Sequence, residues 1–233
     1  MTFGRIRVKT IEDYRNYLKS KSKGEGASSY FARFKKMMKT AYKEGMINRN
    51  PVLDIEKKKL PGAKKKDTLT LREIQLLAST PIESDEVKRA FLFCTLTGLR
   101  WADVSVLIWG DINGRTMTIQ QVKTGMEVSN NLNDTAIKLI GKRGKAKDKV
   151  FDLPTANGAN KTVKAWVKRA GITKQITWHN ARHSFGTNLI HEGEGVLTVS
   201  SMLGHSTMKY TQRYVMASKE LKNRASDKLN FDL

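Results

Sequence analysis

The lysine-rich segment EKKKLPGAKKK, residues 56–66, constrains the fold more than any other stretch of the chain. Six of its eleven residues are Lys, and Pro61-Gly62 stands at its centre. A segment this polar offers no apolar face to bury, so we expect a solvated linker between two domains. The sequence therefore predicts a helical domain over residues 1–55, a basic linker over residues 56–67 and a larger domain over residues 68–233.

The charge of the chain is the second constraint. Its 233 residues include 43 Lys and Arg against 22 Asp and Glu, a formal net charge of +21. This field attracts polyanions; nucleic acid is the first candidate and an anionic membrane surface is the rival. There is no run of about 18 apolar residues to cross a bilayer, and the opening MTFGRIRVKT has no apolar secretion signal. We expect a cytoplasmic protein with no membrane partner.

The single cysteine, Cys94, lies in the apolar run AFLFCTL and is expected to be a small buried hydrophobe. One cysteine allows neither an internal disulfide nor a Cys-based zinc site. The sequence has no Walker loop and no acidic metal cluster. We therefore expect no metal and no cofactor.

The first domain is predicted to hold two helices, over residues 11–19 and from a cap at Ser28 or Ser29 to about Glu44. The apolar positions of the second helix fit a 3.6-residue period, and they are Tyr30, Phe31, Phe34, Met37, Met38, Ala41 and Tyr42. Basic side chains fill its other face and the linker. We expect phosphate contacts from Lys35, Lys36, Lys39, Lys57, Lys58, Lys59, Lys64, Lys65 and Lys66.

The second domain is predicted to be mostly helical with one small sheet. Thr70 and Glu73 form a capping box, and a later apolar helix ends at Gly98. The alternating stretches RTMTIQQ and MEVSNNL predict a β-hairpin with Lys123 at its tip. A short helix is expected after Trp101, and longer ones over about 133–141, 160–170, 179–191, 196–203, 207–215 and 217–228. The fold class is mainly α with a small antiparallel sheet.

Polar residues gather where core residues were expected. In TGLRWADV, Arg100 precedes Asp103 by three, a spacing that also suits an ordinary ion pair at a helix start. In WHNARHSF, His179 and Arg182 lie one helical turn apart and suit a shared phosphate oxygen. Asn180 and His183 are expected to face elsewhere. Zinc is disfavoured, since no acidic or Cys ligand shares this spacing.

Four further residues are candidates with equally plain structural alternatives. Lys123 is a cation on a hairpin tip, and His205 follows Gly204 in a turn. Tyr210 and Tyr214 lie four apart, so one helix face would carry both. Taken alone, such a tyrosine pair is usually packing.

The order and spacing of TGLRWADV, Lys123, HNARHSF and LGHSTMKYTQRY resemble the tyrosine recombinase (phage integrase) family. The family pattern is Arg, a Lys in a β-turn, His-x-x-Arg, Leu-Gly-His and a Tyr nine residues beyond that His, which here is Tyr214. The resemblance covers residues 68–233, and residues 10–52 are similar to part of the family's helical core-binding (SAM-like) domain. The motif sequences are also similar in character to those of integrases of conjugative transposons and phages of Bacteroides-like bacteria. Asn180 and Ala181 depart from the family's usual Asp and Leu.

The resemblance implies a role for each candidate. Tyr214 would attack the scissile phosphate and become joined to the DNA 3′ end, while Tyr210 would be a bystander. The implied catalytic set is Arg100, Lys123, His179, Arg182, His205 and Tyr214, with Asp103 orienting Arg100. The family's core-binding domain has one or two more helices before residue 10, so this one is expected to be truncated or shortened.

The resemblance also implies partners. They are double-stranded DNA at recombination sites, three further protomers in a homotetramer, and a host DNA-bending factor, all at the bacterial nucleoid. The tail bears Leu229, Phe231 and Leu233, which would dock on a neighbouring protomer or simply fray. Three alternatives stay open: a type IB topoisomerase, an integrase-derived DNA-binding regulator without catalysis, and a basic RNA-binding module.

Overall fold

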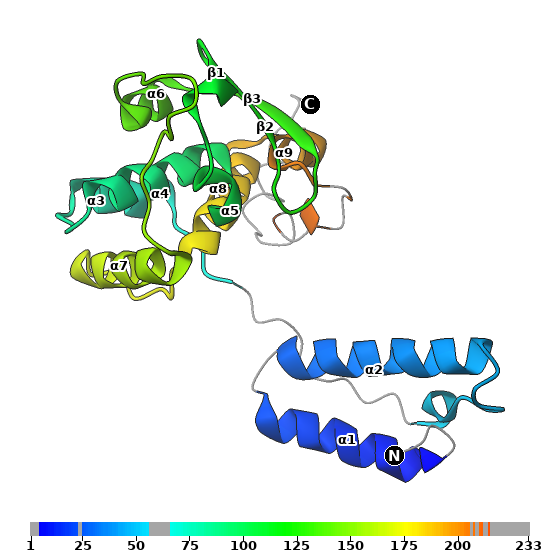
Figure 1. The fold of residues 1–233 in the computed structure, drawn as a ribbon. Helices are drawn as coiled ribbons and strands as arrows, with labels where there is room; N and C mark the ends of the chain where they lie inside the picture. Colours follow the sequence, from blue (N-terminus) through cyan, green and yellow to red (C-terminus); the bar gives the residue numbers. More distant parts are fainter. Residues whose placement is uncertain are drawn as a thin grey trace, which may run out of the picture. The chain divides into compact units, whose positions relative to one another are not determined.

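The computed structural model describes residues 5–22, 25–55 and 66–205, together with residues 207, 210, 211 and 214. The chain divides into two compact units, Met1–Lys65 and Lys66–Leu233 (Figure 1). Its elements are mainly helices, with one three-stranded antiparallel sheet in the second unit, which confirms the predicted fold class. The helices predicted over 207–215 and 217–228, the tail, and Lys57, Lys58, Lys59, Lys64 and Lys65 fall largely or wholly outside the described residues.

The first unit is built on two packed helices, α1 (Val8–Lys21) and α2 (Glu25–Lys43), followed by the 3-10 helix η2 (Pro51–Asp54). Helix α2 begins earlier than predicted, because the Ser22 hydroxyl accepts the backbone N–H of Ala27 at 3.2 Å and supports an earlier first turn. Its end agrees with the prediction, since Gly45 takes a positive φ of 70° that other residues adopt only with strain.

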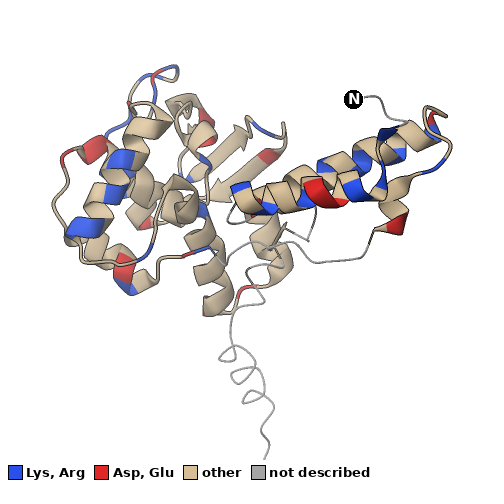
Figure 2. Cartoon of the chain, turned by 90° about the horizontal axis from the view of Figure 1, so that it is seen from below, with Lys and Arg blue, Asp and Glu red and all other residues tan. Residues whose placement is uncertain are grey.

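Only some of the apolar positions of α2 are buried. Phe31, Met38 and Ala41 are buried, whereas Tyr30, Met37 and Tyr42 are 57%, 44% and 49% exposed. Seven positions cover more of a helix circumference than the neighbouring α1 and η2 can bury, so only part of this apolar face lies in the core. The basic residues Lys35, Lys36 and Lys39 are exposed on α2 as expected, and Figure 2 shows Lys and Arg spread over both units.

The second unit packs its helices around α4 and α8. Its helices are α3 (Leu71–Ser79), α4 (Asp85–Thr97), α5 (Trp101–Val104), η3 (Trp109–Asp111), α6 (Asp134–Ile140), α7 (Ala156–Arg169), α8 (Trp178–Glu192) and α9 (Val196–Leu203). At the centre, the Phe91 ring makes edge-on contacts with Trp166 and Trp178, with centroids 5.9 and 5.6 Å away. Burial raises the pKa of the neighbouring Cys94 thiol, which is fully buried as predicted.

The predicted caps of the second unit are confirmed. The Thr70 hydroxyl accepts the Glu73 N–H at 3.2 Å, and the Glu73 carboxylate accepts the Thr70 N–H at 2.7 Å. Helix α4 begins after Ser84, whose side chain accepts the Val87 N–H, and it ends at Gly98 with φ 71°. These local rules fix where the helices that lead to the site begin and end.

The sheet has the order β1-β2-β3, from β1 (Ile112–Asn113), β2 (Thr116–Gln120) and β3 (Glu127–Asn131). Strands β2 and β3 form the predicted hairpin, with Ile119 opposite Val128 and alternate side chains buried. Strand β1 was not predicted, because two residues are too few to show an alternating pattern. The turn between β2 and β3 carries Lys123.

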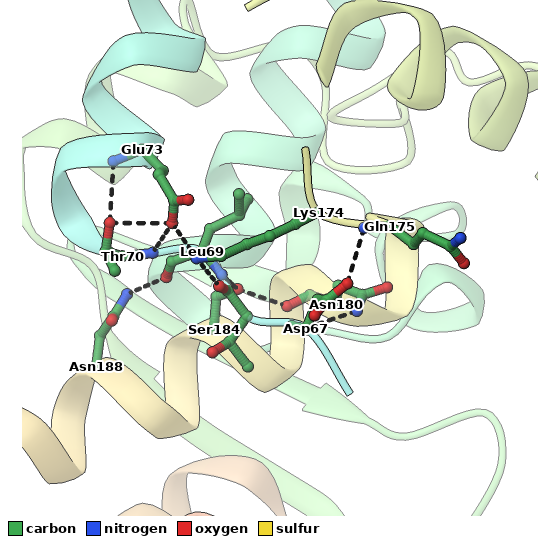
Figure 3. Close-up of polar contacts among 10 residues, drawn as sticks. Asp67, Leu69, Thr70, Glu73, Lys174, Gln175, Asn180, Ser184 and Asn188 are labelled. Atoms are coloured by element: carbon green, nitrogen blue, oxygen red, sulfur yellow. Dashed lines mark hydrogen bonds and ion pairs between the residues drawn. The ribbon is translucent and has the colours of Figure 1, made fainter. Parts of the chain in front are cut away.

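A strap of extended chain, residues 67–70, lies across α8 where the second unit begins (Figure 3). Successive turns of α8 hold it. Asn180 Nδ2 donates to the Asp67 carbonyl at 2.7 Å, and the buried Leu69 N–H donates to Ser184 Oγ at 2.8 Å. Asn188 Nδ2 donates to the Leu69 carbonyl at 3.1 Å. The residues that follow the linker are thereby fastened to the helix that carries His179 and Arg182.

The loop before α8 holds the same strap from the other side (Figure 3). Lys174 Nζ donates to the Thr68 carbonyl at 2.8 Å and to the Glu73 carboxylate at 2.6 Å. Burial alone would raise the pKa of Glu73, but its bonds to Lys174 and Thr70 outweigh burial and lower it. A polar network therefore joins the strap, α3 and α8.

Candidate active site

One pocket of about 300 Å³ gathers the residues singled out from the sequence. Residues far apart in the chain border it: Arg100, Lys123, Thr124, His179, Arg182, His183, Gly204, His205, Tyr210 and Tyr214. The structure thus brings together all six predicted catalytic residues. They come from the start of α5, the hairpin turn, α8, the turn after α9, and position 214 beyond it.

Arg100 reaches the pocket because Gly98 ends α4 in a left-handed turn and the chain then enters α5. Buried Asp103 holds this segment: its Oδ2 accepts the Arg100 N–H at 3.3 Å and lies 3.8 Å from Arg100 Nη1. Its Oδ1 accepts the Val122 N–H at 3.0 Å. Among the described residues, buried Arg100 Nη1 has no hydrogen-bond acceptor, so an incoming anionic oxygen would satisfy it.

Arg182 is almost fully buried at 3% exposure. Its Nη1 donates to the Gly98 carbonyl at 2.7 Å and its Nη2 to the Leu203 carbonyl at 2.6 Å. Burial, followed by the nearby Arg100 charge, lowers the pKa of Arg182 to about 10. The guanidinium is therefore still a cation at neutral pH, and two arginine charges converge on one pocket.

Two histidines of α8 meet at the pocket, rather than one. His179 is exposed and His183 is buried, with ring centroids 4.5 Å apart. His183 Nδ1 lies 3.1 Å from the Tyr214 hydroxyl. The expectation that His183 faces elsewhere was wrong, because residues four apart share a helix face; the spacing from His179 could have revealed it. Asn180 does face elsewhere, where its side chain caps α8 at Thr177.

The two tyrosines differ in burial although both border the pocket. Tyr214 is 4% exposed, whereas Tyr210 is 49% exposed. The Tyr214 ring packs on Gly186 of α8, where an added Cβ would lie 2.9 Å from its Cε2 atom. Only a glycine allows this approach, so α8 is shaped to receive the Tyr214 ring.

His205 is held by the turn that ends α9. Gly204 has φ 58°, and the His205 N–H donates to the Ser200 carbonyl at 3.1 Å. His205 Nδ1 lies 2.8 Å from the Thr211 hydroxyl, and its ring lies 6.4 Å from the Tyr214 ring, nearly parallel to it. The turn thus places an imidazole beside both the pocket and the buried phenol.

Each unit also carries exposed lysines among its described residues. Lys35, Lys36, Lys39 and Lys66 are exposed. In the described part of the chain, no group of three or more His, Cys, Asp or Glu is placed to hold a metal ion. Within residues 5–22, 25–55 and 66–205, no helix is both long and apolar enough to cross a membrane.

Comparison with known proteins places this site in a family. The model of the phage integrase family matches residues 67–220, and that of the phage integrase SAM-like domain matches residues 1–60. The chain belongs to the phage integrase family, the class of tyrosine-type DNA recombinases.

Curated relatives include recombinases and integrases of bacteria. The ICEBs1 integrase of Bacillus subtilis (strain 168) is 25% identical, over 97% of this chain and 72% of that protein. The tyrosine recombinase XerD of Bifidobacterium longum (strain NCC 2705) is 41% identical over 83 residues, 35% of this chain and 24% of that protein. The second match is therefore a local one.

Solved structures share the fold at low sequence identity. The Tn1549 transposon integrase in complex with transposon right end DNA has a TM-score of 0.75 at 16% identity, covering 98% of this chain and 87% of that one. A lambda integrase dimer bound to a COC′ core site has a TM-score of 0.72 at 18% identity, covering 90% and 80%. A lambda integrase tetramer bound to a Holliday junction has a TM-score of 0.67 at 18% identity, covering 87% and 65%.

Proposed function

We propose that this protein breaks and rejoins DNA strands at specific sites through a tyrosine nucleophile, and so integrates or excises a mobile element. One observation carries the proposal: a phenol, two guanidinium groups, imidazoles and a lysine border one pocket. Phosphoryl transfer needs a nucleophile, neutralisation of charge on the phosphate and an acid for the leaving group. The pocket supplies each of these chemical types.

In the proposed first step, Tyr214 Oη forms a bond to the scissile phosphorus and the bond from phosphorus to the DNA 5′ oxygen breaks. A free phenol has a pKa near 10 and needs a base, for which we assign His179. Arg100 and Arg182 hold the non-bridging oxygens, since a guanidinium matches phosphate geometry. The product is a phosphotyrosyl bond at the 3′ end.

The remaining side chains complete that step. His205 donates a further hydrogen bond to the phosphate, and Lys123 gives a proton to the departing 5′ oxygen. Buried Asp103 orients Arg100 through the contacts at 3.3 and 3.8 Å described above. His183 adds a second imidazole at the phenol, 3.1 Å from its oxygen.

The second step reverses the first with a different strand. The 5′ hydroxyl of that strand attacks the phosphotyrosyl phosphorus, forms the new phosphodiester and releases the Tyr214 phenol. One ester replaces another, so the exchange needs no nucleotide hydrolysis to restore the bond.

We infer double-stranded DNA as the substrate and a homotetramer as the working assembly. The net charge of +21 and the exposed lysines of α2 favour DNA. The related lambda integrase is seen as a dimer on a core site and as a tetramer on a Holliday junction. We assign DNA binding to the first unit and catalysis to the second. A host DNA-bending factor and action at the nucleoid complete the proposal.

A nicked half-site substrate tests the proposed chemistry. Loss of the short fragment beyond the scissile phosphate would trap the covalent complex, visible on a denaturing gel. We expect an adduct with wild type and with Tyr210→Phe, and none with Tyr214→Phe. An adduct from Tyr214→Phe would overturn the assignment of the nucleophile.

Two measurements separate the alternatives. A DNA-binding regulator would form no adduct on its cognate site, whereas a topoisomerase would relax supercoiled plasmid without exchanging strands between two sites. DNA affinity should fall steeply with salt because phosphate contacts release counterions. A DNA affinity that does not change with salt concentration would contradict a phosphate-binding surface.

A further inference from the structure

Gln121 lies directly before the turn that carries Lys123, and it is buried at 2% exposure although its side chain is a polar amide. A buried amide needs hydrogen-bond partners for its two donors and its acceptor, so these partners show which segments the Gln121 side chain joins. Its Nε2 donates to the Leu203 carbonyl at 2.9 Å. Its Oε1 accepts the Thr124 hydroxyl at 2.8 Å. The side chain therefore bridges the hairpin turn and the end of α9.

The Leu203 carbonyl is a shared acceptor. It takes the Gln121 amide and also Arg182 Nη2 at 2.6 Å. The next residue, Gly204, has backbone so close to Gln121 that an added Cβ would lie 2.6 Å from its Nε2. After Gly204 comes His205. One carbonyl and one close contact thus link the Lys123 turn to the segment that carries His205 and to the guanidinium of Arg182.

The backbone of Gln121 closes the same turn. Its N–H donates to the Met126 carbonyl at 2.9 Å, and its carbonyl accepts the Gly125 N–H at 2.8 Å. The next residue is held as well, because Asp103 Oδ1 accepts the Val122 N–H at 3.0 Å. The start of the turn is therefore anchored, while Lys123 itself is exposed and has a long flexible side chain.

We propose that Gln121 is a positioning residue for the leaving-group acid: it fixes the Lys123 turn against the Leu203–His205 turn so that the Lys123 ammonium meets the departing 5′ oxygen. The proposal rests on the role of Lys123 assigned above. A lysine on a free hairpin tip samples many positions, and misplacement of an acid by about 1 Å costs rate steeply. The two side-chain bonds of Gln121 reduce that freedom, because they fix the backbone from which the Lys123 side chain extends.

Gln121→Leu removes both side-chain bonds at nearly the same side-chain volume. Comparing two leaving groups shows whether the variant impairs proton donation to the leaving group. An alkoxide leaving group needs a proton, whereas the thiolate of a 5′-bridging phosphorothiolate leaves without one. We expect Gln121→Leu to slow adduct formation by about 10- to 100-fold on the ordinary nicked half-site. The sulfur-containing half-site should restore a rate close to that of wild type.

Asn130→Leu is the matched control. Asn130 of β3 also donates from a buried amide to an α9 carbonyl, that of Met202, at 2.8 Å, but it lies outside the Lys123 turn. It should leave the ratio of oxygen to sulfur rates unchanged. Thr124→Val removes the bond from the exposed Thr124 hydroxyl to Gln121 Oε1, together with the long 3.5 Å bond that this hydroxyl accepts from the Met126 N–H, and should shift the ratio in the same direction by less. It keeps the proposal testable should Gln121→Leu fail to fold.

Lys123→Ala separates this inference from the proposed function. If sulfur rescues Lys123→Ala but not Gln121→Leu or Thr124→Val, the role of Gln121 is wrong and that of Lys123 stands. If sulfur does not rescue Lys123→Ala, the assignment of the acid fails. Equal slowing of Gln121→Leu on both substrates, or no slowing on either, would also overturn the inference.

Discussion

The Ser184 hydroxyl fastens the start of the second unit to α8, so Ser184→Ala should loosen the strap of residues 67–70. Ser184 is fully buried, and its Oγ accepts the Leu69 N–H at 2.8 Å. Leaving that amide without an acceptor costs about 1–3 kcal/mol. Alanine in a helix returns about 0.5 kcal/mol. The net loss is therefore about 0.5–2.5 kcal/mol, a fall in melting temperature of roughly 1–10 °C for a chain of this size.

Two measurements test this prediction on the full chain. Thermal or urea unfolding gives the loss in free energy, and hydrogen exchange of the Leu69 amide reports the strap itself. Ser184 Oγ also donates to the Asn180 carbonyl at 2.7 Å. Ser79→Ala is the control, since the Ser79 hydroxyl likewise donates to a carbonyl of its own helix, that of Leu76 at 2.9 Å, but is exposed. If Ser184→Ala has the same melting temperature as Ser79→Ala, and its Leu69 amide exchanges as slowly as in wild type, the Ser184 hydroxyl does not hold the strap.

Three further predictions concern single positions. Glu73→Gln should lower the unfolding free energy at pH 7 by about 1 kcal/mol. Because the pKa of Glu73 is lowered in the folded protein, the stabilisation by its carboxylate is lost on acidification, and the unfolding free energies of variant and wild type from urea titrations should converge below the ordinary pKa of 4.5. A difference in free energy that stays constant with pH would refute this linkage. At Gly98 an added Cβ would lie 2.6 Å from a neighbouring side chain and the backbone has a φ of 71°, so Gly98→Ala should lower the unfolding free energy by about 2–4 kcal/mol. Gly171→Ala is the control, with a similar φ but open space around the Cβ, and should lower it by about 1 kcal/mol. Equal melting curves for the two variants would contradict this prediction. Gly186→Ala should displace the Tyr214 ring and cut covalent adduct yield while the melting temperature holds; an undiminished yield would contradict the close packing.

Local chemistry predicted much of the fold. Thr70 with Glu73, and Gly98, indicate helix ends because caps depend on residues only a few positions apart. The hairpin followed from alternation on both sides of a glycine turn. The limits of local reasoning show in α2, where burial depends on how much of the helix its neighbours cover, so that exposed Tyr30 resembled core.

The candidate site was predictable as a list of residues but not as an arrangement. Arg100, His179 and Tyr214 were named from motif order, yet their meeting at one pocket depends on contacts between distant segments. His183 was missed because its helix position was weighed without its neighbours. The Gln121 bridge joins residues 82 positions apart, and no local pattern indicates such a bond.

Cys94 gives the protein a built-in reporter of unfolding. Its thiol is the only one in the chain and is fully buried in α4 against the aromatic core, with a raised pKa. A thiol-specific reagent reacts with the thiolate and must reach it, so labelling of the native chain proceeds only as fast as α4 opens. The labelling rate therefore measures the opening of the second unit directly. A cysteine introduced at an exposed position would react on a far shorter timescale and could carry a dye with little background.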